Sequence, residues 1–153
     1  MKRVSSASQF ALVAIVVFLF CLAAVKAGND ELKLQATLIW GTNGTKPKDP
    51  GLKDVEPETA KKLRGVFKWK NYYEVGRTNL TVAVGTGKMV TMSPKCEVSV
   101  QNLGKSKVAV ELYGEGKMLV QKRQPITAGE LLVLAGDDKN DTAWFVILNR
   151  IDR

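Results

Sequence analysis

The side chains best suited to chemistry gather in one window, residues 61–77, where six positive charges meet a single negative charge. Aromatic rings interleaved with cations are common where proteins contact sugars or other proteins. We therefore predict a binding surface there, made of Lys61, Lys62, Arg64, Lys68, Trp69, Lys70 and Tyr72. The competing interpretation is a solvated helix face beside rings that are buried in a core.

Catalysis is disfavoured because the chain contains no histidine. Histidine is the commonest general base and the commonest metal ligand, so Ser–His and Cys–His mechanisms are excluded. A pair of carboxylates, Glu97 and Glu111, falls on strand faces that look solvated, which is the ordinary place for charge on a sheet. We predict a protein that is not an enzyme and needs no cofactor, with a carboxylate-based hydrolase as the remote alternative.

Two segments resemble metal sites only superficially. The acidic stretch GDDKND at 136–141 offers oxygen ligands for calcium, but it lacks the spaced carboxylates and the downstream glutamate of a calcium loop. Asp and Asn also favour turns, so we interpret this stretch as a hairpin turn and leave cation binding open. Met89 and Met92 point to opposite faces of a strand, which favours core filling over a sulfur site for copper. No metal site is predicted.

The first 27 residues have the pattern of an export signal. Lys2 and Arg3 precede an apolar run at 10–24, and small residues end at Ala27. We expect cleavage near Ala27, with an N-terminal membrane anchor as the alternative, and a periplasmic or secreted product. Removing Lys2, Arg3 and Lys26 would leave 20 basic against 15 acidic residues, a modest excess. An exported protein rarely meets nucleic acid, so lipid head groups or acidic polymers are the natural anionic partners.

The remaining residues, 28–153, are about the length of one domain. They contain a single cysteine, Cys96, which cannot form an internal disulfide. It alternates with Val98 and Val100, so we expect a buried, reduced thiol and a fold stabilised by its core.

Residues 55–75 combine the only convincing helix with an aromatic strand. Pro57 suits the first helical position, and Ala60, Leu63 and Phe67 form a narrow apolar stripe. Gly65 is expected to end the helix in a left-handed conformation. Spacing of two then predicts a strand from Phe67 to residue 75.

The rest of the chain reads as short strands separated by glycine, proline and asparagine. They are expected at residues 31–40, 78–84, 88–92, 95–101, 107–113, 117–122, 130–135 and 142–149. Residues 131–135 and 143–148 are apolar throughout, which predicts central strands that are covered on both faces, or strands that are covered by the helix, with Trp144 in the core. The fold class is all-β: a single antiparallel β-sandwich or flattened barrel of about seven to nine strands with one short helix.

Three motifs, LIWGTN at 38–43, VEPETAKKL at 55–63 and FKWKNYYEV at 67–75, resemble a group of small exported bacterial envelope proteins. That resemblance implies an envelope location and a β-rich tail, and it carries over no functional residue. The function we expect is a non-catalytic interaction module with a protein partner in the cell envelope, which an unpaired sheet edge can engage. The alternative is a module that binds carbohydrate, an anionic polymer or lipid.

Overall fold

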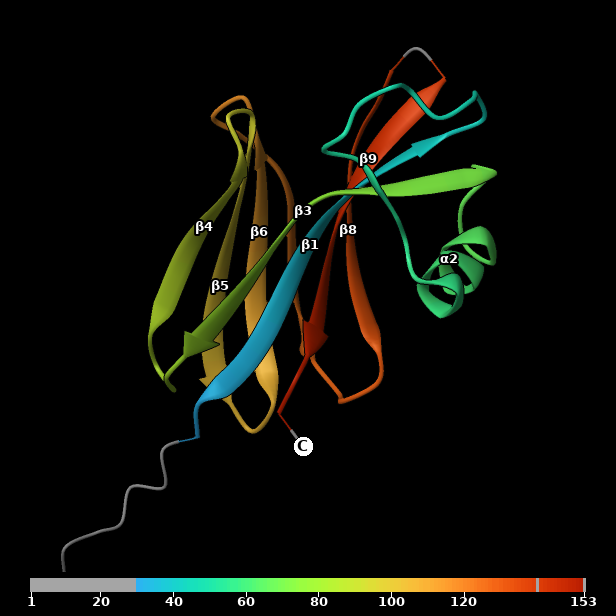
Figure 1. Cartoon of the computed structure of the whole chain (residues 1–153). Helices are drawn as coiled ribbons and strands as arrows, with labels where there is room; N and C mark the ends of the chain where they lie inside the picture. Colours follow the sequence, from blue (N-terminus) through green and yellow to red (C-terminus); the bar gives the residue numbers. More distant parts are fainter. Residues whose placement is uncertain (1–29, 140, 153) are drawn as a thin grey trace, which may run out of the picture.

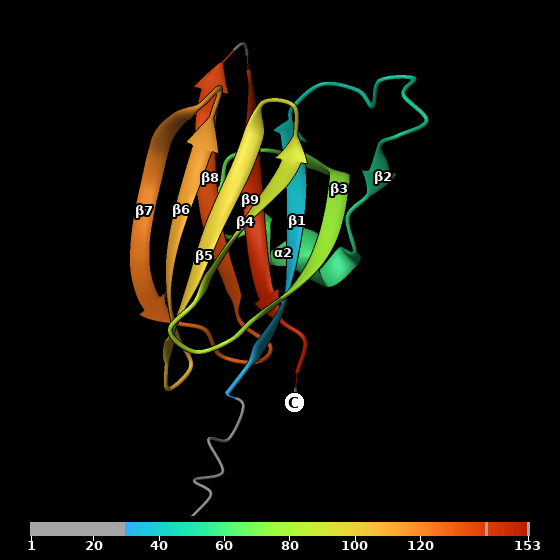
Figure 2. The same ribbon diagram turned by 90° about the vertical axis from the view of Figure 1, so that its left-hand side faces the viewer.

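The computed structural model describes residues 30–139 and 141–152, and at residues 137–139 it describes the backbone only. This part of the chain forms two antiparallel sheets and one short helix, which confirms the all-β prediction (Figures 1 and 2). The sheets face each other as a sandwich and do not close into a barrel. The elements are β1 (Leu32–Thr42), β2 (Lys53–Asp54), α2 (Pro57–Arg64), β3 (Asn71–Val82), β4 (Gly87–Ser93), β5 (Cys96–Gly104), β6 (Lys107–Gly114), β7 (Lys117–Pro125), β8 (Leu131–Lys139) and β9 (Thr142–Arg150).

Strand order is β2-β3-β1-β9-β8 in the five-stranded sheet and β4-β5-β6-β7 in the other. The main core lies between them, because alternate residues of each strand point inward. Leu34, Val98 and Val110 are fully buried there. The alternation predicted for residues 96–100 and 108–112 is therefore confirmed.

A second core lies on the outer face of the five-stranded sheet, under α2. Leu63 of the helix packs with Ile39 of β1 and with Phe145 and Ile147 of β9. β9 is thus buried on both faces, as its continuous apolar run predicts. For the strand at 131–135 the central position is wrong, because β8 is an edge strand. Its outer side chains, Leu131 and Val133, are instead partly covered by the helix, which is the other expectation for this apolar run.

The helix begins at Pro57 as predicted, but its end differs from the expectation. Gly65 has φ −71° and ψ −18°, a right-handed conformation. The hydrogen bonds explain why: Gly65 N–H donates to the Lys61 carbonyl, and Phe67 N–H donates to the Leu63 carbonyl. The chain continues turning after the helix, so no left-handed residue is needed.

The aromatic strand starts later than predicted, at Asn71, and runs without a break to Val82. Three consecutive residues, Tyr72, Tyr73 and Glu74, are buried: Tyr72 in the core under α2, Tyr73 beside the Trp40 ring and Glu74 against Arg77. The predicted strand limits, Phe67 to Val75, are therefore wrong, whereas the register agrees with the prediction that Tyr72 and Glu74 lie on the face opposite Tyr73.

Two further core expectations need correction. Trp144 is only partly buried, at the margin of the main core, so Phe145 and not Trp144 is the large aromatic anchor of β9. Met92 packs on the main core, whereas Met89 is 57% exposed and fills no core. In the described residues, no helix has both the length and the apolar character to cross a membrane.

Cys96 is 3% exposed, as predicted, and loss of hydration together with the nearby Glu97 charge raises the pKa of its thiol to about 11. An unfolded cysteine has a pKa of about 8.5, so the unfolded chain loses this proton first as pH rises. We expect the cysteine's contribution to stability to be complete below pH ~8.5 and to disappear as pH approaches ~11. Urea unfolding across this range will show the decline, and Cys96→Ala, the control, should lack it.

The same burial predicts that a thiol reagent labels Cys96 only after unfolding. Rapid labelling of the folded protein at neutral pH would contradict the buried position.

Candidate functional site

The basic residues of the predicted binding surface are exposed. Lys61, Lys62, Arg64, Lys68 and Lys70 all lie at the surface, three of them on α2. Lys62 Nζ donates to the Gly129 carbonyl at 3.1 Å, which ties the helix to the loop before β8. The two other cations of the helix, Lys61 and Arg64, are also exposed, so the outer side of α2 is strongly basic.

The two rings of that predicted surface are not available for stacking. Trp69 is 3% exposed and Tyr72 is 4% exposed, and both belong to the core under α2. Burial raises the pKa of Tyr72, whose hydroxyl donates to the Phe67 carbonyl at 3.5 Å. The structure thus keeps one contact of the predicted surface, Lys68 Nζ 4.7 Å from the centroid of the Trp69 ring, but it leaves neither ring exposed for a ligand.

A trough runs beside α2, between the helix and the outer face of the five-stranded sheet. One end is a polar cavity of about 80 Å³, and the other is an apolar hollow of about 350 Å³. Leu131 of β8 lines both hollows, so they are neighbours along the helix. We refer to both together as the trough.

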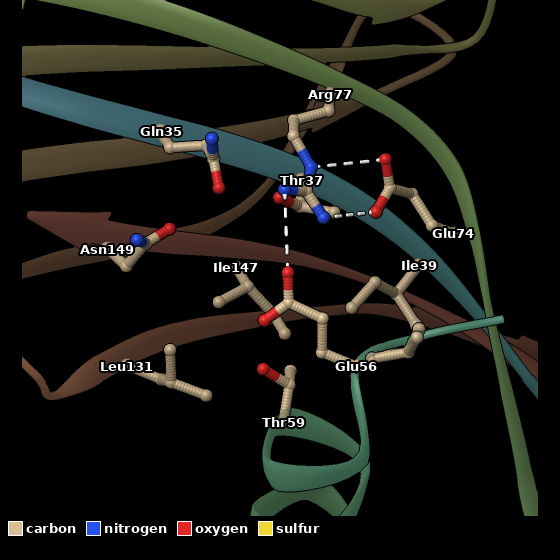
Figure 3. A pocket seen from close by; sticks show the side chains of 11 residues that line it. Gln35, Thr37, Ile39, Glu56, Thr59, Glu74, Arg77, Leu131, Ile147 and Asn149 are labelled. Atoms are coloured by element: carbon tan, nitrogen blue, oxygen red, sulfur yellow. Dashed lines mark hydrogen bonds and ion pairs between the residues drawn. The ribbon is translucent and has the colours of Figure 1, made fainter. Parts of the chain in front are cut away.

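The polar end is organised by an ion pair that depends on a β-bulge (Figure 3). In the pairing of β1 with β3, Leu38 faces Gly76 and Ile39 faces Glu74, so Val75 is the extra residue. A bulge resets the alternation of a strand, which places Glu74 and Arg77 on the same outer face. Arg77 then donates to both oxygens of Glu74, from Nε at 3.1 Å and from Nη2.

The charged side chains at the polar end of the trough form ion pairs with one another. Glu74 is 9% exposed, and its carboxylate raises the pKa of Arg77. Arg77 Nη1 also lies 3.8 Å from Glu56, the residue that precedes the helix. Arg77 is thus held by Glu74 and lies near Glu56, whose side chain remains 71% exposed.

The remaining polar groups of this end come from neighbouring strands. Gln35 and Thr37 of β1 and Asn149 of β9 line the cavity, with Thr59 of the helix opposite (Figure 3). Amide and hydroxyl groups both donate and accept hydrogen bonds. This end can hold a small polar group of a ligand.

The apolar end lies between the C-terminal half of α2 and the edge of the sheet. Leu63, Val66 and Phe67 form one wall, and Leu131 and Val133 of β8 form the other. Val66 is 76% exposed, the largest exposure of any large apolar side chain in the described residues. An apolar surface left open between a helix and an edge strand is typical of a docking site.

The free edge of β8 is partly protected. Lys122 of β7 donates from Nζ to the Val133 carbonyl at 3.1 Å. Lysine at a sheet edge discourages uncontrolled strand pairing. A partner is therefore expected to engage the trough mainly through side chains.

The carboxylates considered for catalysis, Glu97 and Glu111, lie on the paired strands β5 and β6. Glu111 accepts hydrogen bonds from Tyr113 Oη at 2.7 Å and from Gln121 Nε2 at 2.8 Å, and it raises the pKa of Tyr113. Glu97 accepts one from Thr91 at 3.2 Å. Each carboxylate thus serves cross-strand pairing on an open sheet face.

The acidic stretch at 136–141 lies at the connection between β8 and β9, but most of it is strand and not the predicted turn, because β8 continues to Lys139 and Asp138 is paired with Ala143. Asp141 has a φ of 57°, a conformation that Asp tolerates better than most residues. The side chains at 137–140 lie outside the described residues, and the question of a cation stays open. Across the part of the chain that is described, no group of three or more Cys, Asp or Glu side chains is placed to hold a metal ion.

Sequence patterns did not indicate the trough. Its polar end depends on the Val75 bulge, and its apolar end depends on where α2 sits. The one local feature that points to the trough is Val66, an apolar residue just after the helix that is exposed in the structure. Comparison of the chain with protein-family models, curated proteins and solved structures found no match.

Proposed function

We propose that this protein is a non-catalytic interaction module of the cell envelope that holds an extended segment of a partner protein in the trough. The observation that carries the proposal is the open apolar end beside the β8 edge, with Val66 76% exposed. Export and the envelope location are predictions from the first 27 residues.

The charges around the trough define the partner's chemistry. Lys61, Lys62 and Arg64 are exposed on α2, and Lys122 of β7 reaches the β8 edge at Val133. Of the described residues, Glu130 is the only acidic one that lines the apolar end, whereas Glu56 and Glu74 line the polar end beside Arg77. Charge complementarity therefore favours a segment with a large apolar side chain for the hollow and acidic residues beside it.

A second candidate function rests on the same basic residues. A lipid surface or an acidic polymer would bind through charge alone, without a demand on the apolar hollow. The carboxylate hydrolase is the remote third proposal, because Glu97 and Glu111 are engaged in hydrogen bonds on an open sheet face.

The test compares Val66→Asp with Met89→Asp, a matched change at an apolar side chain that is 57% exposed on the other sheet. A displayed library of random linear decapeptides is selected against the wild-type protein. We expect enriched peptides to combine a large apolar residue with acidic neighbours, and Val66→Asp to weaken their binding at least tenfold. Met89→Asp should leave binding unchanged.

A charge-reversed variant, with Lys61, Lys62 and Arg64 changed to Glu, separates the two candidates. If the proposal is right, the charge-reversed variant no longer binds the selected acidic peptides, and Val66→Asp also binds them more weakly. Binding of anionic lipid vesicles or acidic polysaccharide that disappears in the charge-reversed variant but survives in Val66→Asp would support the second candidate. Selected peptides that perturb NMR signals away from α2 and β8 would contradict the proposal.

A further inference from the structure

A separate hollow of about 340 Å³ lies at the end of the sandwich where the β4–β5, β6–β7 and β8–β9 turns gather. The two sheets diverge toward this end (Figure 1). It is lined by Lys95, Gly114, Glu115, Lys117, Leu119, Thr142 and Trp144, none of which borders the trough. Its volume falls near the lower limit of small-molecule sites, roughly 300–1,000 Å³.

The hollow contains an aromatic side chain that the main core leaves partly uncovered. Trp144 is the register partner of Trp40, and Trp40 is the partner of Tyr73, so the three residues form a row across β3, β1 and β9. Trp40 and Tyr73 have ring centroids 6.0 Å apart. Trp144 is the member of this row that borders the hollow.

Two glycines from different sheets make room for the Trp144 indole. A Cβ added at Gly136 of β8 would lie 2.2 Å from Cε2 of the indole, so the ring lies directly against the backbone there. A Cβ at Gly114 of β6 would lie 3.3 Å from its Cζ2 and 2.7 Å from Cδ1 of Leu119. Such tight packing holds the indole in one orientation before any ligand arrives, which lowers the entropic cost of binding.

The rim beside the indole is polar and also held in place. Lys95 Nζ lies 3.3 Å from Glu115 Oε1, and the Glu115 N–H donates to the Lys95 carbonyl at 2.9 Å. This backbone hydrogen bond joins the β4–β5 turn to the β6–β7 turn. The ion pair itself is 79% and 71% exposed, so water screens it and it contributes little to stability. Its ammonium and carboxylate can exchange this contact for ligand hydroxyls at low cost.

We propose that this hollow binds one sugar unit of an oligosaccharide. The apolar face of a sugar ring packs on the Trp144 indole, and its ring hydroxyls hydrogen-bond to Lys95 and Glu115. A rigid aromatic surface beside donors and acceptors at its edge is the arrangement that such a ligand requires, because a sugar has an apolar face and a polar perimeter.

The test is an NMR titration of the isotope-labelled protein with two probes, hexagalacturonate and maltohexaose. We expect the indole N–H signal of Trp144 to shift with both probes. Trp144→Ala should weaken binding at least tenfold. Lys95→Ala and Glu115→Ala, which change only exposed side chains, should each weaken it about threefold, and Lys88→Ala serves as the exposed-lysine control.

If Trp144→Ala fails to fold, the variants Lys95→Ala and Glu115→Ala still test the proposal. Absence of binding by both probes would overturn the proposal, as would binding that Lys95→Ala and Glu115→Ala leave unchanged. If NMR signals from residues of the hollow shift with protein concentration and not with added sugar, the hollow is a contact between copies of this chain. That result would also overturn the proposal. Val66→Asp should bind both sugars normally, so this result is independent of the trough.

Discussion

Replacement of Phe145 by alanine is expected to lower the free energy of unfolding by about 3–5 kcal/mol. Phe145 is 1% exposed and is among the largest fully buried side chains of the described residues. Its ring centroid lies 4.4 Å from that of Phe67 and 6.2 Å from that of Tyr72. Removing it leaves a cavity at the centre of the contact between α2 and the sheet, and rigid neighbours fill such a cavity only in part.

Urea unfolding followed by circular dichroism measures this loss. Phe145→Leu is the matched control, because it keeps most of the apolar volume and should cost less than half as much. Since the cavity adjoins Leu63, we also expect faster hydrogen exchange in α2 of the alanine variant. A loss below ~1 kcal/mol would mean that α2 is not anchored through Phe145.

The second large effect is expected at Asn102, a buried amide that is 1% exposed. Its Nδ2 donates to the Asp30 carbonyl at 2.8 Å and to the Val82 carbonyl at 2.9 Å, and its Oδ1 accepts from the Gly104 N–H at 2.9 Å. One side chain thus joins the segment before β1, the end of β3 and the end of β5.

Asn102→Leu removes all three hydrogen bonds and leaves their backbone partners to find water or remain unsatisfied. Each unsatisfied buried group costs roughly 1–3 kcal/mol, so we expect a total loss of about 2–4 kcal/mol after partial hydration. Asn79→Leu is the matched control, because that amide is exposed and accepts one hydrogen bond, from Gln35. Equal unfolding midpoints for the two variants would show that Asn102 does not join these segments.

The sequence by itself determined the features that depend on neighbours along the chain. Alternation at residues 96–100 and 108–112 specified inward faces of β5 and β6, because successive side chains of a strand point to opposite sides. Pro57 marked the start of α2, because proline fits the first helical position without losing a hydrogen bond. Burial of Cys96 followed from the same alternation.

The tertiary structure decided which faces are covered. Trp69 and Tyr72 have the same local pattern as an exposed aromatic strand, and they are buried only because α2 folds back over β3 and β9. The extra residue at Val75 brings Glu74 and Arg77 together, and no periodicity announces a bulge. Likewise, β8 reads as a central strand but lies at an edge, and Trp144 is partly exposed because the sheets diverge beside it. Strand order and sheet divergence are set by pairings between residues far apart in the chain, which local periodicity does not encode.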